Sequence, residues 1–296
     1  MDSPEDSGVG VEVEVPKSYK ELEESCRRRI GEILSQYPKA RKVYKLLLED
    51  PEVNACWDMA DYVAVKKLRF NDHGKTHAIV VAYFSLEMLE LLKEAGHTPD
   101  IVADGFGDMD DAALIVTAAS LLHDVGNQVH RWGHHEFSVV LSTPILTRIL
   151  PKVYENPEIA AEIRGFILHA IHSHEKEVRS LTTEASIVCI ADGCDMFKGR
   201  GRLPFDLGNV NIHTVSALSI NNVKVEKGEW RPVRITVEMD NSAGIFQVQE
   251  LLKEKVDSGV LGDKVEIVAI AIPPGVSTDH RIVSRIMYEG GRFIPF

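Results

Sequence analysis

The chain has 296 residues, 44% of them hydrophobic and 26% charged, which is the balance of a folded protein with room for two domains. Its formal net charge of −12 argues against sequence-independent nucleic-acid binding, because that needs a basic surface. No apolar run approaches the roughly 20 residues that a membrane-spanning helix needs, so we expect no membrane contact. The segment from Met1 to Pro16 carries acids but no Lys or Arg, unlike a signal peptide. It predicts an acidic disordered tail over residues 1–17 and a cytoplasmic location.

A helical pattern fills most of the chain up to Phe197. Apolar residues recur at steps of three and four, and Pro or Gly separates the stretches, for example at Pro38, Pro51 and Pro151. After a first stretch from Ser18, the predicted helices cover residues 40–49, 52–68, 76–95, 110–123, 134–149, 157–175 and 182–197. We therefore predict an all-α helical domain over residues 18–203 and a mainly α fold for the chain.

The pattern changes after Lys198. Gly and Pro fall close together in the stretch GRGRLPFDLGN, which predicts a linker or an ordered functional loop. Beyond it, apolar and polar residues alternate, as at Val233, Ile235 and Val237, which is the period of a strand. Residues 215–225 and 265–272 are predicted as further strands, and 243–257 as a helix. Residues 204–296 thus predict a small α+β domain with a regulatory or dimerisation role, and an exposed sheet edge there would favour a homo-oligomer.

Histidine and aspartate gather at the ends of the predicted helices. In LLHDVG an apolar helix runs directly into His123 and Asp124 before Gly ends it. A buried acid is costly unless it is paired or bound to a metal, and an adjacent imidazole and carboxylate can ligate the same ion. Asp192 follows another apolar stretch in the same way, and His77 opens a helix with its side chain towards the core. We predict one metal centre from these four residues, with Asp195 in a supporting hydrogen bond.

The order of a His, a His-Asp pair and a distant Asp on a helical bundle resembles the HD superfamily of metal-dependent phosphohydrolases, over roughly residues 60–200. Many of its members hold two metals, and the resemblance implies that His135 in HHEFS and His174 in IHSHE bind the second. Some relatives have a histidine where this chain has Glu175, so that His169 or Glu175 would make up the missing ligand. Mixed nitrogen and oxygen ligation suits Mn, Fe, Co, Ni or Zn better than Mg alone. We expect one or two divalent transition metals.

The resemblance extends beyond the metal ligands. The stretches NDHGKTH, KGRGRLPF and NSAGIFQV are similar to those of a group of poorly characterised archaeal-type HD proteins. The GYP motif of cyclic-dinucleotide phosphodiesterases is absent from the sequence, so we do not assign that substrate. The resemblance implies hydrolysis of a small phosphorylated substrate, a nucleotide foremost, by a metal-activated water. Asp124 is the natural bridging ligand because a carboxylate offers two oxygens.

Basic side chains after Asp192 suggest phosphate contacts. Lys198, Arg200 and Arg202 would clamp a substrate phosphate with charge-assisted bonds, or would form a solvated loop paired with nearby acids; both alternatives stay open. His130 is a further catalytic candidate beside Asp124 and Lys198, against the alternative of an ordinary helix-end histidine. The histidines expected outside the site are His73, as a helix cap, and His134 and His172, as solvated neighbours of ligands.

Three functions compete on this pattern. A metal-dependent phosphohydrolase, either a phosphomonoesterase or a phosphodiesterase, accounts for the His and Asp residues. The alternative is a catalytically weak metal and nucleotide sensor that signals through the C-terminal domain, because Glu175 replaces a histidine. An RNA-processing factor is disfavoured by the net charge of −12. Turnover on generic phosphoesters distinguishes the first two.

Overall fold

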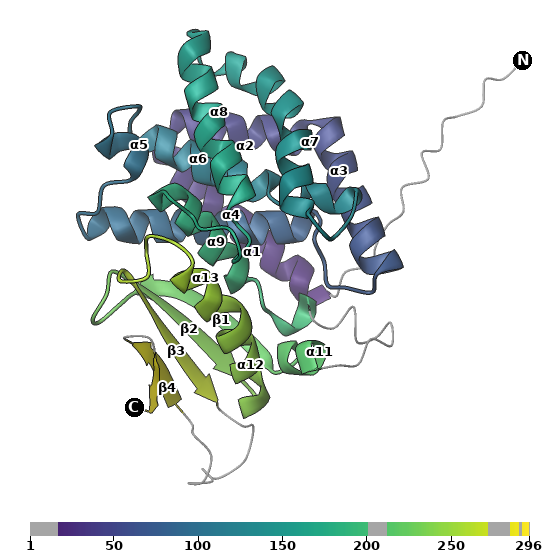
Figure 1. The fold of residues 1–296 in the computed structure, drawn as a ribbon, viewed down its shortest axis with the longest axis vertical. Coiled ribbons are helices and arrows are strands. Elements are labelled where there is room, and N and C mark those ends of the chain that lie inside the picture. The colour runs from purple at the N-terminus through teal and green to yellow at the C-terminus, as the bar shows by residue number, and fades with distance from the viewer. Residues whose placement is uncertain (1–16, 201–211, 272–284, 290–291, 296) are drawn as a thin grey trace, which may run out of the picture.

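The computed structural model of the chain describes residues 17–200, 212–271, 285–289 and 292–295. Figure 1 shows a layer of helices above and a sheet with its own helical segment below. The predicted acidic tail up to residue 16, Arg202 and the predicted boundary after residue 203 lie outside the described residues, so the division into domains stays a prediction. The helical layer consists of α1 (Lys17–Ile33), α2 (Pro38–Glu49), α3 (Pro51–Asp61), α4 (Lys75–Glu94), α5 (Asp100–Ala103), α6 (Met109–Leu122), α7 (His134–Ile149), α8 (Pro157–His172) and α9 (Thr183–Cys194).

Proline and capping residues explain where several of these helices begin. Pro38, Pro51 and Pro157 open α2, α3 and α8, where the missing N–H would have no intrahelical partner in any case. At the start of α6, Asp108 accepts a hydrogen bond from the Asp111 backbone at 3.1 Å, and Asp111 accepts one from the Asp108 backbone at 2.9 Å. This reciprocal pair is a capping box, which satisfies two backbone donors at once.

The centre of the helical layer is formed by α4 and α6. Residues 111–122 of α6 are all buried, as is most of α4. α4 contacts α1 and α9, while α6 contacts α2 and α8, so that apolar side chains face neighbours on every side. The indole of Trp57 on α3 donates to the Leu121 carbonyl at 2.9 Å and fixes the end of α6. None of the described helices has both the length and the apolar character needed to cross a bilayer.

Five described strands form one sheet in the order β1-β2-β3-β4-β5. β1 (Ile220–Lys227) runs antiparallel to β2 (Val233–Met239), and β2 runs parallel to β3 (Val265–Ala271). β4 (Arg285–Glu289) and β5 (Arg292–Pro295) continue the sheet in antiparallel fashion. The parallel pair needs a crossover, which lies across one face of the sheet in Figure 1. The crossover consists of η5 (Ser242–Gly244), α12 (Ile245–Gln247), η6 (Val248–Lys253) and α13 (Glu254–Asp257).

The two layers are in direct contact. β1 and β2 pack against α4, while η6 and α13 pack against α9. Ser186 on α9 accepts a hydrogen bond from the backbone of Val260 at 3.0 Å. Gly193 on α9 leaves room for the crossover, because a Cβ added there would lie 3.0 Å from Lys255 Cδ and 3.4 Å from Leu252 Cδ1. The C-terminal layer therefore packs closely against the last turn of α9.

The predicted mainly α fold with a small α+β part is confirmed, with three differences of detail. The sheet makes an all-α classification wrong for the chain as a whole. Residues predicted to lead into the first strand instead form α11 (Ile212–Ala217), whose Ser216 hydroxyl donates to the Ile212 carbonyl at 2.5 Å. β4 and β5 were not predicted. The order strand, strand, helix, strand is confirmed for the region 220–271.

Gly126 brings the short helix η3 (Val125–Gln128) against the first turns of α7. An added Cβ would lie 2.0 Å from the His134 carbonyl oxygen and 2.5 Å from the Ser138 nitrogen, both backbone atoms. We expect Gly126→Ala to lower the free energy of unfolding by about 3 kcal/mol, because the backbone must move apart. Gly165→Ala on α8, where nothing lies within 4 Å, should instead stabilise by about 0.5–1 kcal/mol. Urea unfolding measures both; equal stabilities would contradict the close packing of η3 on α7.

Candidate metal centre

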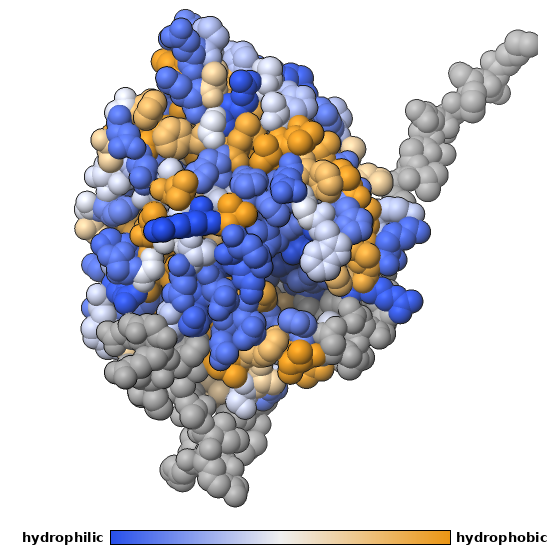
Figure 2. Space-filling view, viewed as in Figure 1, coloured by the Kyte–Doolittle hydropathy of each residue, from blue (hydrophilic) through white to orange (hydrophobic). Residues whose placement is uncertain are grey.

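Five helix ends bring the histidines and carboxylates of the site together. His77 lies in the first turn of α4, and His123 and Asp124 follow the last turn of α6. His134 is the first residue of α7, and Asp192 lies in the last turn of α9. The remaining two residues, His174 and Glu175, directly follow α8. In Figure 2 hydrophilic side chains gather in the middle of the visible face, between the helical layer and the sheet.

One half of the cluster, here called the first subsite, consists of His77, His123, Asp192 and the Oδ2 atom of Asp124. His77 Nε2 lies 3.1 Å from His123 Nε2, 3.1 Å from Asp192 Oδ1 and 3.3 Å from Asp124 Oδ2. His123 Nε2 lies 3.5 Å from Asp124 Oδ2 and 3.7 Å from Asp192 Oδ1. Four tetrahedral ligands at about 2.1 Å from an ion would lie about 3.4 Å apart. The donor atoms are thus spaced as ligands of one ion.

The other half, the second subsite, consists of His134, His174, Glu175 and the Oδ1 atom of Asp124. His134 Nε2 lies 3.0 Å from His174 Nε2, 3.1 Å from Glu175 Oε1 and 3.2 Å from Asp124 Oδ1. His174 Nε2 lies 3.7 Å from Asp124 Oδ1. Each oxygen of Asp124 therefore faces a different subsite. This position is consistent with the bridging role predicted for Asp124.

The outer nitrogens of three of the rings fix which tautomer each of these histidines adopts. His123 Nδ1 lies 2.8 Å from the Ser120 carbonyl, and His134 Nδ1 and His174 Nδ1 lie 3.0 and 2.6 Å from the carbonyls of Arg131 and Ile171. A carbonyl only accepts, so each Nδ1 must carry the hydrogen and each Nε2 of a neutral ring has a lone pair. Two such lone pairs lie only 3.0 Å apart in the second subsite and repel each other, and positive charge close to them relieves this repulsion. This pattern is typical of metal ligands.

Charge and burial favour the same interpretation. Burial alone would raise the pKa of Asp124, but the rings of His123 and His73 hold it well below its usual range. Burial, with His123 and His134 nearby, holds the pKa of His174 well below its ordinary value. Burial would also lower the pKa of His77, yet its carboxylate partners raise it well above the ordinary value. The cluster therefore combines ionised carboxylates with a strong demand for positive charge, which a divalent cation would meet.

A set of hydrogen bonds behind the first subsite orients His77. Its Nδ1 lies 2.7 Å from Asp195 Oδ2, which also accepts a hydrogen bond from the Tyr19 hydroxyl at 2.5 Å. The buried guanidinium of Arg200 donates to the carbonyls of Asp195 and Asp72 at 2.8 and 2.7 Å. A carboxylate behind a histidine fixes its tautomer and makes it a better ligand. The supporting role predicted for Asp195 is thus consistent with its position.

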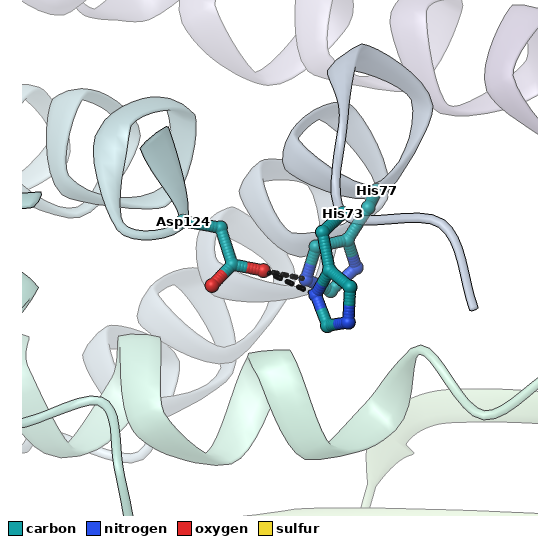
Figure 3. Close-up of side chains that lie close together, drawn as sticks. All are labelled: His73, His77 and Asp124. Carbon is teal, nitrogen blue, oxygen red and sulfur yellow. Dashed lines mark hydrogen bonds and ion pairs between the residues drawn. The ribbon is translucent and has the colours of Figure 1, made fainter. Parts of the chain in front are cut away.

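His73 lies in the cluster instead of capping α4, whose N-cap is Gly74. His73 Nδ1 lies 2.7 Å from Asp124 Oδ2, and dashed lines in Figure 3 join the same oxygen to both His73 and His77. Burial lowers the pKa of His73 to about 3, so the ring is neutral. The His73 backbone donates to Asp61 Oδ1 at 2.9 Å, which holds this residue close to the centre. The capping role predicted for His73 is corrected accordingly.

Other predicted site residues lie elsewhere. His135 groups with Glu136 and His172, apart from the cluster. His169 Nε2 accepts a hydrogen bond from the Leu181 backbone at 3.1 Å, and His130 Nδ1 accepts one from the Trp132 backbone at 3.0 Å. Lys198 is exposed and lies 2.5 Å from Asn221 Oδ1, at the edge of the sheet. Arg200 is buried, and its guanidinium donates to the backbone carbonyls of Asp72 and Asp195 behind His77. Arg202 lies outside the described residues.

Three residues at the centre were not predicted from the sequence. The resemblance gives His135 as the ligand and leaves His134 as a solvated neighbour, but His134 is only 3% exposed. Arg131 lies 3.0 Å from His134 Nε2 and 3.2 Å from Glu175 Oε1, and the turn before α7 gave no periodic signal for it. Lys255, from α13, donates to Asp192 Oδ2 at 2.7 Å, across a separation in sequence that local patterns do not span.

The buried imidazoles and ionised carboxylates that meet at these helix ends form a cluster that is compatible with metal binding. Residues 71–196 match the family model of the HD domain. The chain is 40% identical over 229 residues to the uncharacterised protein MJ1020 of Methanocaldococcus jannaschii. The aligned region covers 77% of this chain and 88% of that relative. No solved structure matches the chain. The chain belongs to the HD domain family, whose members are in general metal-dependent phosphohydrolases.

Proposed function

We propose that this protein is a metal-dependent phosphohydrolase that acts on a small phosphoester, a nucleotide foremost, as a phosphomonoesterase or phosphodiesterase. The observation that supports this most is the division of Asp124 between two sets of ligands, with Oδ2 facing His77 and Oδ1 facing His134. Two metals a few ångströms apart suit the in-line displacement of phosphoesters. Divalent Mn, Fe, Co, Ni or Zn fits the mixed donor set.

A bound transition metal supplies a Lewis acid that polarises a phosphoryl oxygen and lowers the pKa of water to roughly 7. The residues of the chain supply orientation and charge. Asp195 holds His77, and the carbonyls of Ser120 and Ile171 hold His123 and His174. We propose that Arg131 binds substrate phosphate, in place of the loop cations predicted from sequence. Its side chain is 28% exposed and its NH1 lies 3.9 Å from Asp124 Oδ1.

Turnover by metal-free and metal-loaded protein tests the proposal. We expect the chelated protein to be inactive and loading with Mn or another first-row ion to restore hydrolysis of a chromogenic phosphomonoester or phosphodiester and of nucleotides. The gain should exceed about 100-fold, because several kcal/mol of transition-state stabilisation come from the metal. A protein that binds metal and hydrolyses none of these substrates would contradict the proposal and favour the sensor.

A further inference from the structure

The C-terminal layer reaches the metal centre through one buried lysine. Lys255 lies on α13 and is 6% exposed. Its ammonium donates to Asp192 Oδ2 at 2.7 Å and to the His174 carbonyl at 2.7 Å. Asp192 belongs to the first subsite and His174 to the second. A single side chain from the other layer thus contacts both halves of the centre.

The contact determines which oxygen of Asp192 is free to face the cluster. Oδ2 is taken by Lys255, while Oδ1 lies 3.1 Å from His77 Nε2. With Oδ2 held by the ammonium of Lys255, Oδ1 is the oxygen of Asp192 that is turned towards the cluster. Burying an ammonium is costly unless its hydrogens find partners, and here a carboxylate and a carbonyl accept them. The pair is therefore well satisfied as well as buried.

The surrounding packing is built to admit this side chain. A Cβ at Gly193, the residue after Asp192, would lie 3.0 Å from Lys255 Cδ. Lys176, just beyond Glu175, donates to the Glu250 carbonyl at 3.3 Å and ties the same crossover to the second subsite. On the other side, the Cys189 thiol lies 3.5 Å from the Ser258 hydroxyl. Contacts of residues before and after Lys255 in the chain therefore hold the crossover against the helical layer.

We infer that Lys255 is a positioning residue through which the C-terminal layer holds both metal subsites in place. This inference rests on the proposed metal centre and assigns the C-terminal domain a direct part in it. Metal binding and the docking of the crossover on α9 are then linked: an ion that binds the oriented Asp192 also stabilises the contact of Lys255, and loosening that contact weakens metal binding.

Metal titration of full-length variants tests the inference. Lys255→Met keeps the length of the side chain and removes its charge, and we expect the dissociation constant for Mn²⁺ to rise about 10–100-fold, as for other residues that orient ligands. Lys253→Met is the matched control, because Lys253 pairs with Asp257 at 2.9 Å and does not face the centre; its Mn²⁺ affinity should equal that of the wild type. Combined with Asp192→Asn, the Lys255→Met change should add less than about twofold to the loss.

Equal or tighter Mn²⁺ binding by Lys255→Met would overturn the inference, since Lys255 would then act only as a competing charge. If Lys255→Met does not fold, hydrogen exchange of the wild type decides instead. Addition of Mn²⁺ should slow exchange in residues 248–257, and unchanged exchange there would overturn the linkage. A wild type that binds neither Mn²⁺ nor any of the Fe, Co, Ni and Zn ions would refute the metal centre itself, which distinguishes failure of the proposed function from failure of this inference.

Discussion

Asp124→Asn is expected to remove both metals and to lower phosphohydrolase activity by about 10³-fold or more. Asparagine keeps the shape of the side chain, but it has no charge and only one oxygen for two subsites. The change therefore weakens the ligand sets of His77 and His134 at once. Loss of a Lewis acid costs several kcal/mol of transition-state stabilisation, and about 4 kcal/mol corresponds to 10³-fold. Elemental analysis of the purified protein, together with activity under saturating Mn²⁺, measures both effects.

Asp111→Asn is the matched control for this change. Asp111 is also buried, at the opposite end of α6, where it pairs with Lys39 at 2.6 Å and with the Tyr154 hydroxyl at 2.5 Å. The control is expected to lose stability, because the capping box is weakened, but to keep its metal content and its activity per folded molecule. Asp124→Asn protein that retains two ions and full activity would refute the assignment of Asp124 as the bridge.

The fold and the first subsite were accessible from sequence because their signals are local. An apolar helix that ends in a His-Asp pair cannot leave those side chains unpartnered, and the same reasoning placed Asp192 at the end of α9. The structure brings these residues to within hydrogen-bonding distance of one another or close to it. Polar residues at the ends of apolar helices are therefore enough to predict most ligands of the first subsite.

The remaining features depend on contacts that a local pattern does not contain. Lys255 reaches Asp192 only because the crossover between β2 and β3 packs on α9, which the alternation of strand residues does not indicate. The start of α7 depends on the left-handed turn at Gly133, with φ of 75°, which sets how far the helix is rotated. A shift of one residue in an α-helix rotates the side chain by about 100°, enough to exchange one histidine for its neighbour.

Replacing His134 or its neighbour His135 by Ala is expected to have very different effects on the second subsite. His134→Ala should remove one Mn²⁺ ion and leave the other, because the first subsite keeps all of its members, namely His77, His123, Asp192 and Asp124 Oδ2. His135→Ala, on the next residue of the same helix turn, should keep both ions, since His135 lies with Glu136 and His172. Activity should fall by about 100-fold or more in the first variant and less than about threefold in the second, in proportion to the loss of one metal. Ion counting by elemental analysis, with activity on the same samples, tests the pair.

The two variants also decide which of the two neighbouring histidines binds the second metal, His135 as the resemblance implies or His134 as the geometry indicates. The resemblance placed the ligand at His135, whereas the tautomer argument places it at His134, whose Nδ1 donates to the Arg131 carbonyl and leaves Nε2 facing His174. His135 Nδ1 is buried and has no hydrogen-bond partner among the described residues. Loss of one ion in His135→Ala but not in His134→Ala would mean that α7 is rotated by one residue in the metal-bound protein. Loss in His134→Ala alone would identify His134 as the ligand of the second subsite.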